Sequence, residues 1–145
     1  MRSRILGLLT VVMLIAAGPA DGDATKKDLE KMQGDWAAAS MVVDGTKLSD
    51  DEAQCLFRTV KGDHYTVYHF NKEIGKGALA IDATKKPKTI DATPAGKAKP
   101  LRGIYELEGD RLKVCFAPPG KDRPTDFEAK EGSGHTLTVW EREKK

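Results

Sequence analysis

Hydrophobic and polar residues alternate along most of the chain beyond residue 34, a period of two that is typical of β-strands with one buried face. The clearest case is the hairpin over residues 101–116, in which Gly109-Asp110 supplies a tight turn between two alternating arms. Asp44-Gly45 indicates a second hairpin. Other strand-like runs are expected at residues 36–43, 54–60, 64–70, 77–83, 88–93, 125–130 and 135–142. Short strands separated by turn residues favour an antiparallel barrel of eight or nine strands.

A different period precedes the first strand. Leu29, Met32 and Trp36 follow the i, i+3, i+7 spacing of one helical face, and Gly34 is the expected end of that helix. The expected N-cap is one of two residues, Thr25 or Asp28. The sequence therefore predicts an all-β fold with one short N-terminal helix.

Alternation along the strands also selects the residues that should face into the barrel. The expected interior comprises Trp36, Phe57, Val67, Tyr105, Leu107, Leu112, Val114, Phe116, Leu137 and Val139. A barrel of this size is either filled by its own side chains or holds one small ligand. The predicted ligand-binding residues are Trp36, Phe57, Val67, Tyr105, Leu107 and Phe116.

Residues 1–20 have the layout of a secretory signal peptide. Two arginines precede an apolar run, residues 5–17, that is short for a bilayer span, and small residues follow it at the expected cleavage point. The alternative is an uncleaved N-terminal anchor. We expect export to the periplasm or the exterior, with residues 21–145 forming one domain that has no membrane span after cleavage.

The net charge of the chain does not point to a particular class of partner. The whole chain has 24 basic and 22 acidic residues, and both charged residues of the predicted signal peptide are basic. The mature domain would therefore carry balanced charge. A nucleic-acid partner is not expected from this balance or from the compartment.

Two cysteines, Cys55 and Cys115, would enter an oxidising compartment. A disulfide between them would close a long loop and stabilise the fold by restricting the unfolded chain. Each cysteine lies in a strand-like run, and their relative placement does not follow from the sequence. A bridge and two separate buried thiols are both open alternatives.

Motifs for catalysis and metal binding are absent from the sequence. His64 and His69 are an odd number of residues apart, so on one regular strand they point to opposite faces. The sequence has no Cys-x-x-Cys or His-Glu-x-x-His pattern, no Gly-x-Ser-x-Gly and no Gly-rich phosphate loop. We therefore predict a protein that is not an enzyme and needs no metal or cofactor.

Gly34-Asp35-Trp36 opens the first strand after the helix, and Arg142 lies near the end of the last one. This pair of features resembles a lipocalin-type barrel. In that fold a Gly-x-Trp plugs the closed end and a basic residue from near the end of the chain packs over the indole. The resemblance implies structural roles for Gly34, Trp36 and Arg142, because a guanidinium can stack on an indole face.

Four longer motifs occur in one order from about Leu29 to Trp140. They are Asp28-Leu29-x-x-Met32-Gln33-Gly34-x-Trp36, Lys86-Pro87-Lys88-Thr89-Ile90-Asp91, Gly103-Ile104-Tyr105-Glu106-Leu107-x-Gly109-Asp110 and Cys115-Phe116-Ala117-x-Pro119-Gly120-x-x-Arg123-Pro124-Thr125-x-Phe127. This set resembles an uncharacterised small domain family that is abundant in exported proteins of planctomycete bacteria. The resemblance implies a lipocalin-like barrel and brings no activity with it.

The leading functional hypothesis is non-catalytic binding of a small apolar molecule inside the barrel, an argument from fold. The alternative is a protein–protein interaction or structural module of the cell envelope. A cavity of ligand size would favour the first hypothesis. A filled barrel with an exposed apolar patch of several hundred Å² would favour the second.

Overall fold

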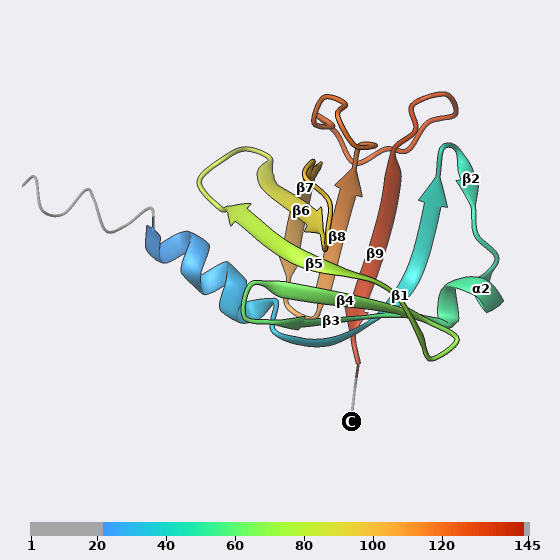
Figure 1. Cartoon of the computed structure of the whole chain (residues 1–145), viewed down its shortest axis with the longest axis horizontal. Helices are drawn as coiled ribbons and strands as arrows, with labels where there is room; N and C mark the ends of the chain where they lie inside the picture. The colour runs from blue at the N-terminus through green and yellow to red at the C-terminus, as the bar shows by residue number, and fades with distance from the viewer. Residues whose placement is uncertain (1–21, 144–145) are drawn as a thin grey trace, which may run out of the picture.

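A computed structural model describes residues 22–143, so the predicted signal peptide lies outside the described residues. The strands form one antiparallel sheet in the order β2-β1-β3-β4-β5-β6-β7-β8-β9. Pairing of β1 with β9 closes eight of them into a barrel, and β2 is an extra strand on β1 (Figure 1). The strands are β1 (Gly34–Val43), β2 (Thr46–Lys47), β3 (Leu56–Lys61), β4 (His64–His69), β5 (Lys72–Asp82), β6 (Lys88–Pro94), β7 (Leu101–Glu108), β8 (Arg111–Phe116) and β9 (Thr136–Arg142). The predicted antiparallel, lipocalin-like barrel with a short N-terminal helix is confirmed.

The N-terminal helix covers residues 22–31, and neither expected N-cap residue caps it. The buried Asp28 carboxylate instead accepts hydrogen bonds from Tyr105 Oη and Lys88 Nζ, each at 2.8 Å. Thr25 Oγ1 accepts a hydrogen bond from the backbone N–H of Ala83 at 3.0 Å. These residues attach the helix to the barrel. The only other helix in the described chain is the one-turn α2 (Asp50–Gln54), and neither helix is long and apolar enough to cross a membrane.

Strand β1 changes partners and phase along its length. Its first residues pair with β3, while most of the strand pairs with β9. The pairing with β9 shifts between Ala38 and Ser40, so the intervening residue forms a β-bulge. Because of this extra residue, Met41 packs against the core from the same strand as Trp36 and Ala38.

Residues 125–130, expected as a strand, are not one. They belong to the long connection between β8 and β9. Ala129 of this connection is buried outside the main core cluster, as are Ile104 and Cys115 of β7 and β8. Cys115 Sγ also lies 3.6 Å from the carbonyl oxygen of Glu128. The connection therefore covers the outer face of the barrel wall instead of extending the sheet.

The two cysteines are free. Cys55 lies between α2 and β3, whereas Cys115 is in β8. In the closed sheet β1 and β9 lie between those two strands, and Cys115 faces outward beneath the β8–β9 connection. A disulfide needs Cα atoms within about 7 Å. Of the two alternatives, the structure therefore has two separate thiols and no disulfide bridge.

Trp36 fills the closed end of the barrel and is fully buried. Its Nε1–H donates to the carbonyl oxygen of Met32 at 2.9 Å, where the N-terminal helix leads into β1. The guanidinium carbon of Arg142 lies 4.3 Å from the Trp36 ring centroid. Arg142 Nη1 donates to the carbonyl oxygen of Gln33 at 2.7 Å, and Nη2 donates to that of Lys31. This one side chain joins the last strand to the start of the first.

Gly34 is required at the same place. Its φ is +113°, a backbone conformation that residues with a Cβ rarely adopt. A Cβ at this position would also lie 3.3 Å from Arg142 Nη1. The glycine thus leaves room for the guanidinium that covers Trp36.

We predict that Arg142→Ala lowers the free energy of unfolding by about 2–4 kcal/mol, because both the stacking and the charged hydrogen bonds are lost. The measurement is urea unfolding followed by tryptophan fluorescence. Arg111→Ala, at an exposed position on the neighbouring strand, is the control and should change stability by less than about 0.5 kcal/mol. Equal losses in the two variants would contradict the role of Arg142.

We also predict that unreduced protein takes up two alkyl groups per chain in denaturant, measured by mass spectrometry. In the folded protein Cys115 should react more slowly than Cys55, because Cys115 is fully buried and burial raises the pKa of its thiol. Alkylation that requires prior reduction would show a bridge and refute this assignment.

Candidate functional site

A cavity of about 690 Å³ lies at the end of the barrel opposite Trp36. Residues from the beginnings of β3, β5, β7 and β9 line it, together with residues from the ends of β6 and β8. In an antiparallel barrel these positions lie at one end. Exposed residues such as Glu73 and Lys76 are part of the lining, so the cavity reaches the surface. We call this end of the barrel the open end.

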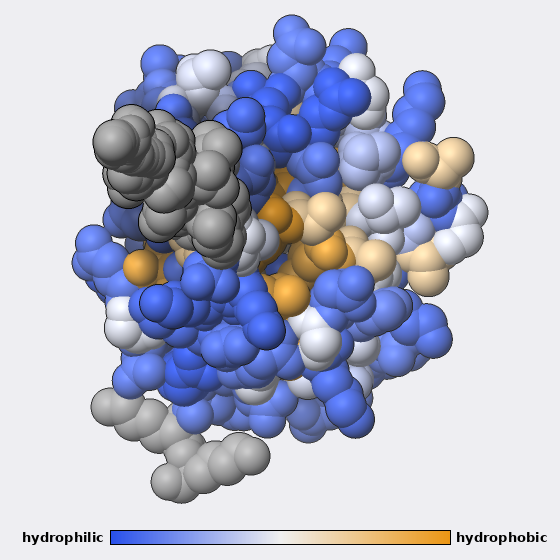
Figure 2. All heavy atoms as spheres, turned by 90° about the vertical axis from the view of Figure 1, so that its left-hand side faces the viewer, coloured by the Kyte–Doolittle hydropathy of each residue, from blue (hydrophilic) through white to orange (hydrophobic). Residues whose placement is uncertain are grey.

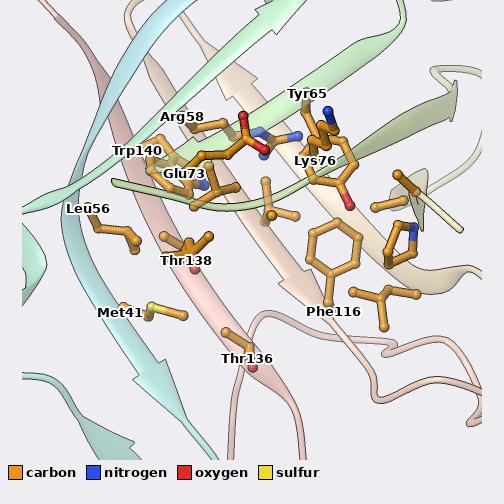
Figure 3. Close-up of a pocket in the computed structure, with 18 residues that line it drawn as sticks. Met41, Leu56, Arg58, Tyr65, Glu73, Lys76, Phe116, Thr136, Thr138 and Trp140 are labelled. Carbon is orange, nitrogen blue, oxygen red and sulfur yellow. The ribbon is translucent and has the colours of Figure 1, made fainter. Parts of the chain in front are cut away.

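The walls of the cavity are mainly apolar. Tyr65 and Phe116 extend into the cavity from β4 and β8, with Met41 and Leu56 further along the wall (Figure 3). The other apolar lining residues are Val67, Ile74, Ala92, Pro94, Ala95, Leu101, Val114 and Trp140. Two of the six predicted ligand-binding residues, Val67 and Phe116, therefore lie in the cavity wall.

The other four predicted ligand-binding residues lie elsewhere. Trp36 and Tyr105 are completely or almost completely buried at the closed end. Leu107 packs against the same core and does not line the cavity. Phe57 was expected to face inward and does not, because its neighbours Leu56 and Arg58 line the cavity and alternate residues share a face.

Tyr105 belongs to a polar cluster that is internally satisfied. Its hydroxyl donates to Asp28, and Lys88 Nζ donates to the same carboxylate oxygen, Oδ2. Burial raises the pKa of Tyr105, and the hydrogen bond to the Asp28 carboxylate raises it further. The phenol therefore stays protonated and keeps donating, which suits a structural role at the closed end.

Arg58 is the main residue of the cavity that the sequence did not predict. It lies on β3 between Leu56 and Val60, and only 4% of its surface is exposed. Its guanidinium carbon is 5.6 Å from the ring centroid of Tyr65 and 5.9 Å from that of Trp140. Figure 3 shows these rings close to the arginine. Apolar residues two positions before and after Arg58 were the available sign that it faces inward.

The interior face of β9 is also the opposite of the predicted one. Thr136, Thr138 and Trp140 line the cavity, so Leu137 and Val139 lie on the outer face. Trp140 pairs with Ala38 of β1, which is buried in the core. Because directly paired residues share a face, this register turns Trp140 inward.

The guanidinium of Arg58 has no anionic partner within residues 22–143. Its Nε is buried and has no hydrogen-bond partner, and no ion pair involves Arg58 in this part of the chain. Burial lowers the pKa of Arg58 to about 10, with Tyr65 acting weakly in the opposite direction. The side chain is therefore still charged at neutral pH, in a site where an unpaired charge is costly.

Other polar groups line the same cavity. Thr136 and Thr138 place hydroxyl-bearing side chains along β9. Among the lining residues that the structure describes, Glu73 is the one carboxylate, and Lys76 is the one cation besides Arg58. No group of three His, Cys, Asp or Glu side chains in the described chain is arranged to hold a metal ion. The cavity is thus an apolar chamber with one buried positive charge.

Comparisons of the chain with models of protein families, with curated proteins and with solved structures find no match.

We predict that Arg58→Met raises the free energy of unfolding of the ligand-free protein by about 1–3 kcal/mol, because it removes an uncompensated buried charge. The measurement is denaturant unfolding at neutral pH. Arg102→Met, at an exposed position on β7, is the control and should change stability by less than about 0.5 kcal/mol. A loss of stability in Arg58→Met alone would mean that the fold depends on this guanidinium.

Proposed function

We propose that the protein binds a small, largely apolar molecule in the open end of the barrel and releases it unchanged. The observation that supports this proposal is the cavity of about 690 Å³. Ligand sites for small molecules typically have volumes of about 300–1,000 Å³ and mostly apolar walls. The cavity has the right size and the right chemical character.

The two ends of the barrel differ in packing. Met32, Trp36 and Leu112 are fully buried at the closed end. At the open end, Met41, Val67 and Phe116 are only partly buried although they face inward. An apolar molecule in the cavity would remove their surface from water, which stabilises a complex by about 25 cal/mol per Å² of apolar surface buried.

The chemistry of the lining favours binding over catalysis. Neither a histidine nor a cysteine lines the cavity among the described residues. Its titratable groups are Arg58, Tyr65, Glu73 and Lys76, and burial raises the pKa of Tyr65. These four groups therefore do not include a nucleophile paired with a base that could activate it.

We place this binding outside the cytoplasm, in the periplasm or the exterior. The support for export is the signal-peptide pattern of residues 1–20. The motif order between Leu29 and Trp140 supports membership of the exported planctomycete family that the sequence resembles. Export would bring the cavity into contact with molecules outside the cell.

The alternative role, an interaction module of the cell envelope, has weaker support. The exposed large hydrophobic residues in the described chain are Val43, Phe70 and Ile74. On the face shown in Figure 2, hydrophobic residues gather in a central hollow within a mainly hydrophilic surface. Ile74 also lines the cavity, and single exposed hydrophobic residues such as these are normal on protein surfaces.

We predict that the neutral fluorophore N-phenyl-1-naphthylamine binds the protein in a 1:1 ratio, with increased and blue-shifted emission. Ala92→Phe places a ring inside the cavity and should weaken probe binding at least about tenfold, since it removes the volume that the probe occupies. Fluorescence titration measures both effects.

Ala80→Phe is the matched control, because Ala80 is exposed on the outer face of β5. It should leave probe affinity within about twofold of the original. Leu101→Trp offers a second way to fill the cavity if Ala92→Phe does not fold. No saturable binding to the unaltered protein would refute the proposed function.

A further inference from the structure

The open-end cavity contains a charge that the described protein does not neutralise. Arg58 lies in the interior, and its Nε has no hydrogen-bond partner. An arginine carries five N–H donors in a planar arrangement and cannot lose its charge readily. Buried arginines are normally paired. A guanidinium that forms no ion pair in the described chain and lies in a ligand-sized cavity therefore indicates that its partner comes from outside.

The closed end of the same barrel provides an internal comparison. There the buried Asp28 carboxylate receives hydrogen bonds from Tyr105 and from Lys88. At the surface, Arg123 pairs with Asp91 at 2.7 Å. Arg58 differs from these groups because its guanidinium forms no ion pair in the described chain and its contacts there are with two rings, those of Tyr65 and Trp140. Aromatic faces attract a cation but accept no conventional hydrogen bond from it.

We infer that the ligand is an amphipathic anion, whose single acidic head group binds Arg58 and whose apolar tail lies along the cavity toward the open end. This inference rests on the proposed function, since it names the class of molecule that the open end would bind. A carboxylate matches the guanidinium by accepting two parallel N–H hydrogen bonds. The hydroxyls of Thr136 and Thr138 line the same cavity and can donate to the remaining lone pairs.

The position of Arg58 on β3 determines the orientation. Leu56 is the first residue of β3 at the open end, Arg58 is two residues deeper, and Val60 packs in the core toward the closed end. A head group at Arg58 therefore leaves its tail against apolar residues such as Val67, Leu101 and Phe116. A purely apolar ligand would leave the guanidinium unpaired.

The other charged lining residues are less suited to bind the head group. Lys76 is exposed, so water already solvates its ammonium group. Glu73 is exposed on the same strand and would repel an anion that approached it. Only 4% of the Arg58 surface is exposed, and electrostatic attraction is stronger at such a site than at the protein surface.

The test compares decanoate, decanol and decylamine, which share one alkyl chain and differ in the charge of the head group. Binding is measured at neutral pH by displacement of N-phenyl-1-naphthylamine, below the concentrations at which the probes aggregate. The unaltered protein should bind decanoate at least about tenfold more tightly than decanol and should bind decylamine least tightly. In Arg58→Met the preference for decanoate over decanol should disappear, while decanol affinity stays equal or increases.

Two further variants separate Arg58 from the general charge of the open end. Lys76→Met removes one positive charge from the same cavity and should change the decanoate preference by no more than about threefold. Arg58→Lys keeps the charge but cannot form two parallel hydrogen bonds, so it should retain only part of the preference. Loss of the preference in Lys76→Met with retention in Arg58→Met would overturn the inference.

The remaining outcomes distinguish this inference from the proposed function. Equal affinity for decanoate and decanol, or tighter binding of decylamine, would overturn the anionic ligand and leave apolar binding intact. If neither the three compounds nor the neutral probe binds, both the anionic-ligand inference and the proposed function are refuted.

Discussion

The contact between Arg142 and Trp36 is the constraint on which the rest of the barrel depends. β1 must pair with β3 on one side and with β9 on the other, and only then does the sheet close. The guanidinium holds these partners together because it stacks on the indole and donates to carbonyl groups at the end of the helix. With the closed end filled in this way, the remaining interior volume is confined to the opposite end.

The polar groups of the interior are divided between the two ends in a similar way. Near the closed end, Asp28, Tyr105 and Lys88 satisfy one another and fasten the helix to the wall. At the open end, Arg58 has no such partner among the described residues. A buried charge without a partner lowers stability, and proteins commonly tolerate such a cost where a site must recognise something. The unpartnered charge therefore distinguishes the open end of the barrel from the closed end.

Features that depend on local chemistry could be predicted from the sequence. The hairpin of β7 and β8, the turn at Asp44-Gly45 and the change of period at Gly34 all depend on neighbouring residues. Features that depend on register could not. On β3, hydrophobicity alone favours Phe57 over Arg58 as the inward residue, and the opposite holds because Arg58 pairs directly with Trp36. The bulge beside Ala38 likewise changes which residues of β1 face inward, without a local sign such as a glycine.

Pairing between distant residues also determines that the two cysteines stay apart and that the connection between β8 and β9 is not a strand. Residues 125–130 have a composition that suits a strand, but they lie over Cys115 on the outside of the barrel wall. The same arrangement keeps Cys115 away from Cys55. Six inward residues were selected as one ligand-binding set, yet the barrel assigns Trp36 and Tyr105 to its closed end and Val67 and Phe116 to its open end. Sequence alternation carries no information on the depth of a residue along the barrel.

Both ends of the described chain lie on the side of the barrel away from the cavity. The N-terminal helix contacts the turn between β5 and β6 through Thr25 and Ala83, and Glu143 donates its backbone N–H to the carbonyl oxygen of Asp35 at the start of β1 (Figure 1). A tether joined to either end would therefore hold the domain from the side opposite the open end. The tether could be a linker to a solid support or a fused reporter protein. The open end of the cavity would point away from the attachment point and stay accessible to the surrounding solution.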